Sequence, residues 1–316
     1  MLTYRAFIDT LAARFRQAGL SYGHGTTNAD DEAAWLVVHS AGAAFETLPE
    51  LLERPVPRGV VNRAARLADQ RIEDRVPMAY LLHEAWLGDH RFYIDQRVIV
   101  PRSYLAELLR RRLQPWVRHS RIRRVLDLCT GSGCLAIIAA EAFPEALVDA
   151  VDLSRDALAV AQKNVNDYRL ADRIRLIRSD LFTVLNGERY DLILTNPPYV
   201  LDRVMRRLPE EYRQEPVMAL AGGRSGLDLI NPILQQSADY LAAEGWLFME
   251  TGHARPAVVK HHTDIRFIWP ETSGGDDCVL AVQKESLQPA RRPVQTPPRS
   301  PAKKRRARSA AKPGRA

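Results

Sequence analysis

The stretch Asp191-Leu192-Ile193-Leu194-Thr195-Asn196-Pro197-Pro198-Tyr199 joins a short apolar run to a proline-rich corner. The apolar part is typical of a buried strand. Prolines cannot donate to a sheet ladder, so the strand must end before Pro197. Each proline also pushes the residue before it towards an extended conformation. The pattern predicts a stiff corner at the carboxyl end of a strand, presenting an amide, a carbonyl and an aromatic ring. Taken alone, the corner fits a purely structural turn equally well.

From Arg123 onward, strand-like and helix-like segments alternate along the chain. The predicted strands cover residues 125–128, 146–153, 174–177, 190–195, 246–250 and 279–282, and the predicted helices include 135–138, 156–168 and 227–242. This alternation predicts an α/β fold, a doubly wound parallel sheet with helices on both faces. Ligands of such sheets bind at the carboxyl ends of the strands.

The chain before this region has a different pattern. Residues 1–75 carry apolar residues at helical spacing, and Asn28 is placed to cap the second of three predicted helices. Residues 76–102 contain strand-like runs at 80–82, 86–87, 91–94 and 97–100, which predict a β-hairpin that joins two domains. We therefore expect an N-terminal helical substrate-recognition domain at 1–75, a hairpin linker at 76–102 and a catalytic domain at 103–285, which begins with a helix over 103–113.

The net charge of +7 belongs to the end of the chain. Residues 286–316 hold ten Lys or Arg and no Asp or Glu, which leaves 35 basic and 38 acidic residues in 1–285. The 286–316 segment has six prolines and little apolar content, so we expect a disordered basic tail. Such a tail could make weak contact with RNA, or could be only a solvated extension.

Several classes of protein are disfavoured by the composition. No apolar run approaches the roughly 20 residues that span a bilayer, and the amino terminus lacks the layout of a secretory signal. The three cysteines, Cys129, Cys134 and Cys278, have no histidines nearby and suggest neither a disulfide framework nor a zinc site. We expect a cytoplasmic protein with reduced cysteines, no membrane contact and no metal.

A glycine-bearing loop, Asp127-Leu128-Cys129-Thr130-Gly131-Ser132-Gly133, lies between the first predicted strand of the sheet and its helix. Glycines allow close approach of the backbone to a ligand, and the helix amino terminus offers free N–H groups. Cys129 stands where the dinucleotide fingerprint has its first glycine, so the loop is not a full fingerprint. A structural tight turn is the alternative.

Two acidic positions follow the next two predicted strands. Asp152 is placed to accept both hydroxyls of a ribose, unless it only caps the following helix. In Ser179-Asp180-Leu181-Phe182, a carboxylate that can accept from an exocyclic amine stands beside an apolar residue that can pack on a ring. With the proline corner, candidate sites end four successive strands, an order that indicates one binding site for an adenosine-like cofactor.

On these motifs the chain resembles class I S-adenosylmethionine-dependent methyltransferases, and more narrowly the protein-glutamine methyltransferases that modify release factors or a ribosomal protein. Further matches are Val100-Pro101-Arg102, Glu215-Pro216-Val217-Met218-Ala219-Leu220 and Gly226-Leu227-Asp228. Tyr22-Gly23-His24-Gly25-Thr26 and the glycine loop are most similar to the branch that methylates large-subunit ribosomal protein number three. Thr27-Asn28-Ala29-Asp30 departs slightly from that branch, and the basic tail is not part of the pattern.

The resemblance implies S-adenosyl-L-methionine as the methyl donor. The cofactor-binding residues would be Asp127, Cys129, Thr130, Gly131, Gly133, Asp152, Asp180, Leu181 and Asn196. The substrate amide would lie against Asn196, Pro197, Pro198 and Tyr199, of which Asn196, Pro197 and Tyr199 would be catalytic. The substrate would be a glutamine of the ribosomal protein, before or during ribosome assembly.

Two alternatives stay open at this point. A release factor could be the methylated protein, or an exocyclic amine of RNA or DNA could be the acceptor, because similar corners serve both chemistries. The acidic body disfavours nucleic acid, since binding to a duplex depends on a basic footprint. A cofactor-binding scaffold without activity is disfavoured because candidates stand at every cofactor and acceptor position.

Overall fold

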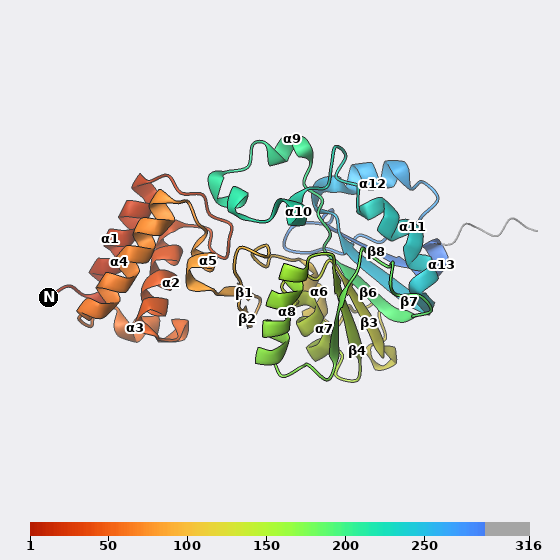
Figure 1. Ribbon diagram of the computed structural model, residues 1–316, viewed down its shortest axis with the longest axis horizontal. Helices are drawn as coiled ribbons and strands as arrows, with labels where there is room; N and C mark the ends of the chain where they lie inside the picture. The colour runs from red at the N-terminus through yellow and green to blue at the C-terminus, as the bar shows by residue number, and fades with distance from the viewer. Residues whose placement is uncertain (288–316) are drawn as a thin grey trace, which may run out of the picture.

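The computed structural model describes residues 1–287, and the predicted basic tail lies outside them from residue 288 onward. The chain runs from a helical unit, through a small hairpin, into an α/β sheet domain (Figure 1). Within these residues, no helix combines the length and the apolar character that crossing a membrane requires.

The helical unit packs around its second helix, most of whose residues are buried. Its elements are α1 (Tyr4–Gln17), α2 (Ala29–Ala41), η1 (Phe45–Thr47), α3 (Leu48–Leu51) and α4 (Arg58–Glu73). The Asn28 side chain accepts from the Asp31 N–H, and acidic residues fill the first turn of α2, which confirms the predicted cap. Leu11, Phe15 and Leu36 are fully buried and form the core of this unit.

The hairpin is shorter than the sequence predicts. It consists of β1 (Ala85–Leu87) and β2 (His90–Phe92), paired antiparallel. The prediction of a strand over 80–82 is wrong, because Met78–Leu82 forms helix α5, which begins right after Pro77. Residues 97–100 form no strand either. Side-chain contacts that are described below hold this segment in place. The boundaries at 75, 102 and 285 stay predictions.

Within the described residues, a six-stranded sheet has the order β5-β4-β3-β6-β7-β8. Its strands are β3 (Arg124–Leu128), β4 (Leu147–Asp152), β5 (Ile174–Arg178), β6 (Tyr190–Thr195), β7 (Leu241–Glu250) and β8 (Val279–Gln283). The strands are parallel except for β8, which pairs antiparallel with β7 at the edge. The α/β prediction is confirmed, with this edge strand as the departure from a wholly parallel sheet.

Helices cover both faces of the sheet (Figure 1). On one face lie α6 (Leu105–Arg110), α7 (Cys134–Ala142) and α8 (Arg155–Asp167), and on the other α11 (Ile230–Tyr240) and α12 (Arg255–His261). Neighbouring strand residues such as Val125 and Leu126 belong to the two opposite cores. Burial on both faces explains why the strands read as continuous apolar runs. The predicted helices over 103–113 and 227–242 are shorter in the structure, and β7 already begins at Leu241.

A long connection between β6 and α11 extends from the sheet towards the helical unit (Figure 1). It contains α9 (Asp202–Met205), η3 (Glu210–Gln214) and α10 (Val217–Leu220). The remaining short helices are η2 (His119–Arg121), η4 (Gly252–Ala254) and α13 (Lys284–Leu287).

Candidate active site

The strand order changes direction at β3 and β6, which are neighbours in the sheet although two strands separate them in the chain. The loops after such strands part to opposite sides and leave a crevice at the carboxyl edge. A pocket occupies this place. The predicted site residues that line it are Cys129, Thr130, Gly131, Asp152, Asp180, Leu181, Asn196 and Pro198. Asp127, Gly133, Pro197 and Tyr199 do not contribute to the lining of this pocket in residues 1–287.

The glycine loop turns sharply out of β3. Cys129 and Gly131 have φ angles of 59° and 55°, so the backbone is left-handed on both sides of Thr130. The cysteine therefore holds the conformation that a glycine provides in the dinucleotide fingerprint, at a steric cost that an ordinary turn would avoid. Gly133 lies at the amino end of α7 and packs against Ala161 of α8. This conformation brings the backbone of the loop to the pocket wall.

Asp127 lies behind the loop. It is fully buried, and its Oδ2 accepts from the Thr130 hydroxyl at 2.5 Å. Burial raises its pKa to about 7, although the Thr130 hydrogen bond opposes the shift. The structure thus places Asp127 where it shapes the loop from behind, and Thr130 at the pocket surface.

Asp152 joins two strand ends through its carboxylate. Oδ2 accepts from the Gly131 N–H at 2.9 Å, and Oδ1 accepts from the Ser154 N–H at 2.8 Å. The cap of α8 is Ser154 itself, whose hydroxyl accepts from the Ala157 N–H. Burial raises the pKa of Asp152, and the N–H donors counter that effect. The carboxylate lines the pocket, and each oxygen retains acceptor capacity beyond its one backbone donor.

The turn after β5 supplies the next wall. Asp180 and Leu181 both line the pocket, and Leu181 has a φ angle of 45°. A bulky residue in this left-handed region is uncommon and is usually held there by its surroundings. Phe182, by contrast, is fully buried in the core of the sheet and stacks on Tyr240.

The proline corner continues directly from β6. The Thr195 hydroxyl donates to the Leu128 carbonyl at 2.9 Å, which ties the corner to the start of the glycine loop. Asn196 lies at the pocket wall, and its Nδ2 donates to the Arg102 carbonyl at 3.4 Å. A carbonyl can only accept, so this contact fixes which end of the Asn196 amide is the nitrogen and leaves Oδ1 as the acceptor elsewhere.

The corner is held from outside by a segment after α10. The Val200 N–H donates to the Leu220 carbonyl, and the Val200 carbonyl accepts from the Gly222 N–H, both at 2.8 Å. Gly222 lies so close to Tyr199 that a Cβ would approach the Tyr199 Cα to 2.6 Å. Only glycine permits this approach. The Tyr199 ring itself packs against Gly252, and burial, followed by the nearby Glu250 charge, raises the pKa of its hydroxyl.

Arg102 and Ser103 line the same pocket, and neither was predicted to bind ligand. The sequence contains a signal for Arg102, because Val100-Pro101-Arg102 matches the family pattern. The match by itself does not show which residues Arg102 contacts or that it lies at the pocket. Met218 and Ala219 of α10 also line the pocket, from a second quoted match. These residues come from two segments that are far apart in the sequence and meet over the strand ends.

A doubly wound sheet with a glycine loop, an acidic residue after the second strand and an Asn-Pro-Pro-Tyr corner after the fourth defines a class: the Rossmann-like S-adenosylmethionine-dependent methyltransferases. A family described as the methyltransferase small domain matches residues 106–208. A ribosomal protein uL3 glutamine methyltransferase of Bordetella pertussis is 47% identical over 286 residues, 90% of this chain and 96% of the relative. Another, from Neisseria meningitidis serogroup B, is 44% identical over 288 residues, 91% of this chain and 95% of the relative.

The chain belongs to the ribosomal protein uL3 glutamine methyltransferase family. Among solved structures, the catalytic domain of hMettl16 in complex with the MAT2A 3'UTR hairpin 6 is 16% identical with a TM-score of 0.49, over 71% of this chain and 80% of that one. A likeness at this level bears on neither substrate nor mechanism.

Proposed function

We propose that this protein transfers a methyl group from S-adenosyl-L-methionine to the side-chain amide nitrogen of a glutamine in ribosomal protein uL3. The relatives that carry this name match nearly their whole length. The observation that carries the proposal is the orientation of Asn196. Its nitrogen is engaged by the Arg102 carbonyl, so Oδ1 is available as an acceptor at the pocket wall.

The pocket residues fit the cofactor by their chemistry. Asp152 is a half-buried carboxylate with spare acceptor capacity for the ribose hydroxyls, and Asp180 with Leu181 offers an acceptor and an apolar surface for adenine. Cys129, Thr130 and Gly131 present backbone at the wall, and Asp127 and Gly133 support that loop. The cofactor supplies an electrophilic methyl group on a sulfonium.

The acceptor amide poses a problem of positioning. Its nitrogen is a poor nucleophile because the lone pair is delocalised into the carbonyl. In our proposal, Asn196 Oδ1 and the Pro197 carbonyl each accept one N–H of the substrate amide, which fixes the nitrogen and aims its lone pair at the methyl. Two fixed acceptors also favour the positive charge that develops on the nitrogen. Pro198 and Tyr199 complete the acceptor site, and the proton leaves to water after transfer.

The setting of the reaction is part of the same proposal. We place the enzyme in the cytoplasm, where uL3 is methylated before or during ribosome assembly. The 286–316 segment, with ten Lys or Arg and no acidic residue, is suited to weak contact with RNA. Deletion of 286–316 should leave activity on free uL3 unchanged and reduce it on uL3 bound to ribosomal RNA. A loss on free uL3 would contradict this role.

One assay tests the substrate. Purified protein and methyl-labelled cofactor are incubated separately with uL3, a release factor, ribosomal RNA and DNA. Label on a uL3 glutamine supports the proposal, and label on the release factor or on a nucleic acid would replace it with that alternative.

The role of Asn196 has its own test. Asn196→Ala should lower the turnover of uL3 at least a hundredfold, because the acceptor of the substrate N–H is lost. Cofactor affinity measured by calorimetry should stay within a few fold. Retained turnover would remove Asn196 from the mechanism.

A further inference from the structure

Asn196 receives its orientation from a residue that is itself clamped. The Arg102 carbonyl accepts the Asn196 Nδ2–H, and the Arg102 side chain forms a bidentate pair with Glu215, with Nη1–Oε1 at 2.7 Å and Nη2–Oε2 at 2.5 Å. Glu215 Oε1 also accepts from the Val100 N–H at 2.9 Å. One carboxylate thus fastens both ends of the Val100–Arg102 segment.

Glu215 is deeply buried, at 2% exposure. Burial alone would raise its pKa, but the His24 and Arg102 contacts lower it to about 2, so the carboxylate is charged at neutral pH. A buried carboxylate that binds a guanidinium through two hydrogen bonds restricts the positions that the arginine can adopt. This rigidity reaches the Arg102 main chain, whose carbonyl faces Asn196.

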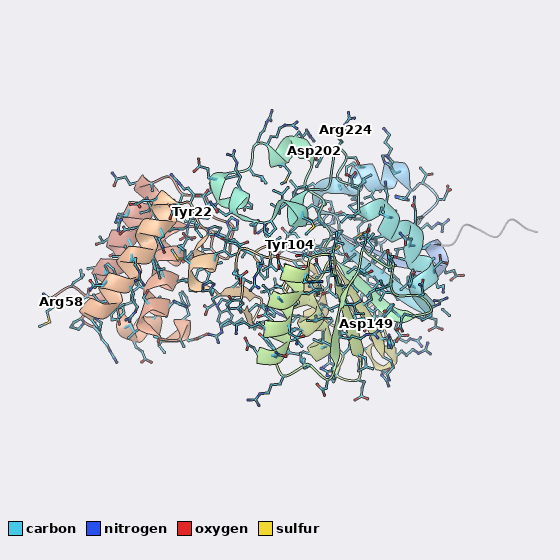
Figure 2. The ribbon with its side chains drawn as sticks, viewed as in Figure 1. Tyr22, Arg58, Tyr104, Asp149, Asp202 and Arg224 are labelled. Atoms are coloured by element: carbon cyan, nitrogen blue, oxygen red, sulfur yellow. The ribbon has the colours of Figure 1, made fainter. Side chains whose placement is uncertain are left out.

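The helical unit encloses the other side of this carboxylate. His24, at 2% exposure, has its Nε2 3.7 Å from Glu215 Oε2, and its ring lies 4.2 Å from that of Tyr212. Tyr212 in turn lies under the Arg102 guanidinium, 5.3 Å from ring centre to Cζ. A Cβ on Gly23 would approach the Tyr212 hydroxyl to 2.2 Å, so glycine is required for this contact. The neighbouring Tyr22 lies at the edge of the helical unit nearest the sheet domain (Figure 2).

We propose that Glu215 is a positioning residue for methyl transfer, acting through Arg102 to hold the Asn196 amide in the orientation that leaves Oδ1 free for the substrate. The loop Tyr22–Thr26 acts behind it, because its His24 covers the buried Glu215 carboxylate on the side away from Arg102. This inference rests on the proposed function, because it assigns a purpose to the same Asn196. It also connects a loop of the helical unit that does not line the pocket to the positioning of Asn196.

The test begins with Glu215→Gln, which keeps the side-chain shape but turns one acceptor for Arg102 into a donor. We expect kcat on uL3 to fall at least tenfold, with cofactor affinity within about threefold of wild type. The matched control is Asp149→Asn. Asp149 is also a buried carboxylate that grips an arginine bidentately, with both contacts to Arg175 at 2.8 Å. It lies in the lower part of the sheet domain (Figure 2), and neither Asp149 nor Arg175 lines the pocket, so the kcat of Asp149→Asn should match that of wild type.

A double variant separates positioning from general damage. Arg102→Ala should lower kcat by a factor similar to that of Glu215→Gln, and the double variant should be no slower than either single one, because both act on one path. The proposal would be overturned if the fold-losses in kcat of the two single variants multiplied in the double variant. It would also be overturned by an unchanged kcat in Glu215→Gln, or by an equal loss of kcat in Asp149→Asn.

A second readout does not depend on the substrate. The side-chain amide signal of Asn196, assigned by its disappearance in Asn196→Ala, should exchange with solvent several-fold faster in Glu215→Gln than in wild type or Asp149→Asn. An unchanged exchange rate would overturn the role of Glu215 even if uL3 proved not to be the substrate. If wild type failed to methylate uL3 but the Asn196 amide exchanged faster in Glu215→Gln, the proposed function would be wrong and the positioning role of Glu215 would stand. Arg102→Ala serves the same measurement if Glu215→Gln does not fold.

Discussion

Asp152 shows how one side chain serves both the fold and the site. Its two oxygens accept N–H groups from the glycine loop and from the start of α8, and so connect the ends of β3 and β4. The same carboxylate lines the pocket. An apolar residue in this position would leave two backbone donors without their acceptor.

We predict that Asp152→Asn weakens cofactor binding at least tenfold. An asparagine has one acceptor oxygen, so its nitrogen must face either the Gly131 N–H or the Ser154 N–H as a second donor, and one acceptor at the pocket wall is lost. Calorimetric titration with the cofactor measures the affinity. Asp156→Asn, an acidic residue in the first turn of the same helix, is the control and should bind as wild type does. An affinity of Asp152→Asn within twofold of wild type would contradict the role.

The three cysteines should be slow to react with thiol reagents. Burial raises the pKa of Cys134 to about 12 and that of Cys278 to about 11, and burial beside the Asp152 carboxylate also raises the pKa of Cys129. Because the thiolate is the reactive form, a disulfide reagent at pH 7.5 should label the folded protein at least tenfold more slowly than the protein in guanidinium. A cysteine that reacts at the denatured rate would contradict the raised pKa of its thiol.

Among the elements, the junction of β7 with α6 carries a second titratable group. Glu250, at the end of β7, accepts from the Ser103 hydroxyl and from the Leu105 N–H at the start of α6. Burial raises its pKa to about 7 against the opposing effect of these donors. The group therefore binds a proton in the folded state in a pH range where it has lost it in the unfolded state.

This shift predicts a pH-dependent stability. Because the folded pKa exceeds the ordinary value of 4.5, the contribution of Glu250 is complete below pH 4.5 and is lost as the pH rises to about 7. Glu250→Gln keeps the acceptor oxygen and cannot ionise, so its stability relative to wild type should rise by on the order of 2 kcal/mol from pH 4.5 to 7.5. Urea unfolding at several pH values measures this difference. If the free energies of unfolding of wild type and Glu250→Gln changed with pH in parallel, the prediction would be wrong.

At the scale of the whole molecule, one buried arginine connects the helical unit to the connection that carries Glu215. Arg71 of α4 is 1% exposed and donates to Glu32 at 2.7 Å, to Glu211 of η3 at 3.2 Å and to the Ser21 carbonyl at 2.8 Å. Both carboxylates are buried with it. Buried, hydrogen-bonded ion pairs therefore join the helical unit to the connection between β6 and α11.

We predict that Arg71→Met lowers the free energy of unfolding by about 3–5 kcal/mol, because it leaves buried Glu32 without its arginine and Glu211 with only Arg75, at 3.6 Å. Arg14→Met is the control, since the Arg14–Asp69 pair is largely exposed and should cost no more than about 1 kcal/mol. Chemical unfolding of both variants measures the difference. Equal losses would show that the Arg71 network contributes no more than a surface pair.

The sequence predicted most of the sheet and the strand-end positions of the site. Most of the buried parallel strands are apolar runs, and Asp152, Asp180 and Asn196 lie at or within two residues of a strand end, so local pattern was sufficient. The strand over 80–82 was wrong because an apolar run of three residues fits a short helix as well as a strand. The antiparallel edge strand β8 and the early start of β7 depend on pairing between strands that are distant in the chain.

The amino-acid sequence by itself determined that Asn196 ends a strand with its backbone stiffened by two prolines, because φ restriction and the missing N–H are properties of proline wherever it stands. Only the tertiary structure decided which way the Asn196 amide points. Its partner Arg102 is 94 positions away, and the Glu215 that clamps Arg102 is 113 positions from it. Hydrogen-bond partners at such separations are brought together by the packing of the helical unit and the sheet, which no local pattern specifies.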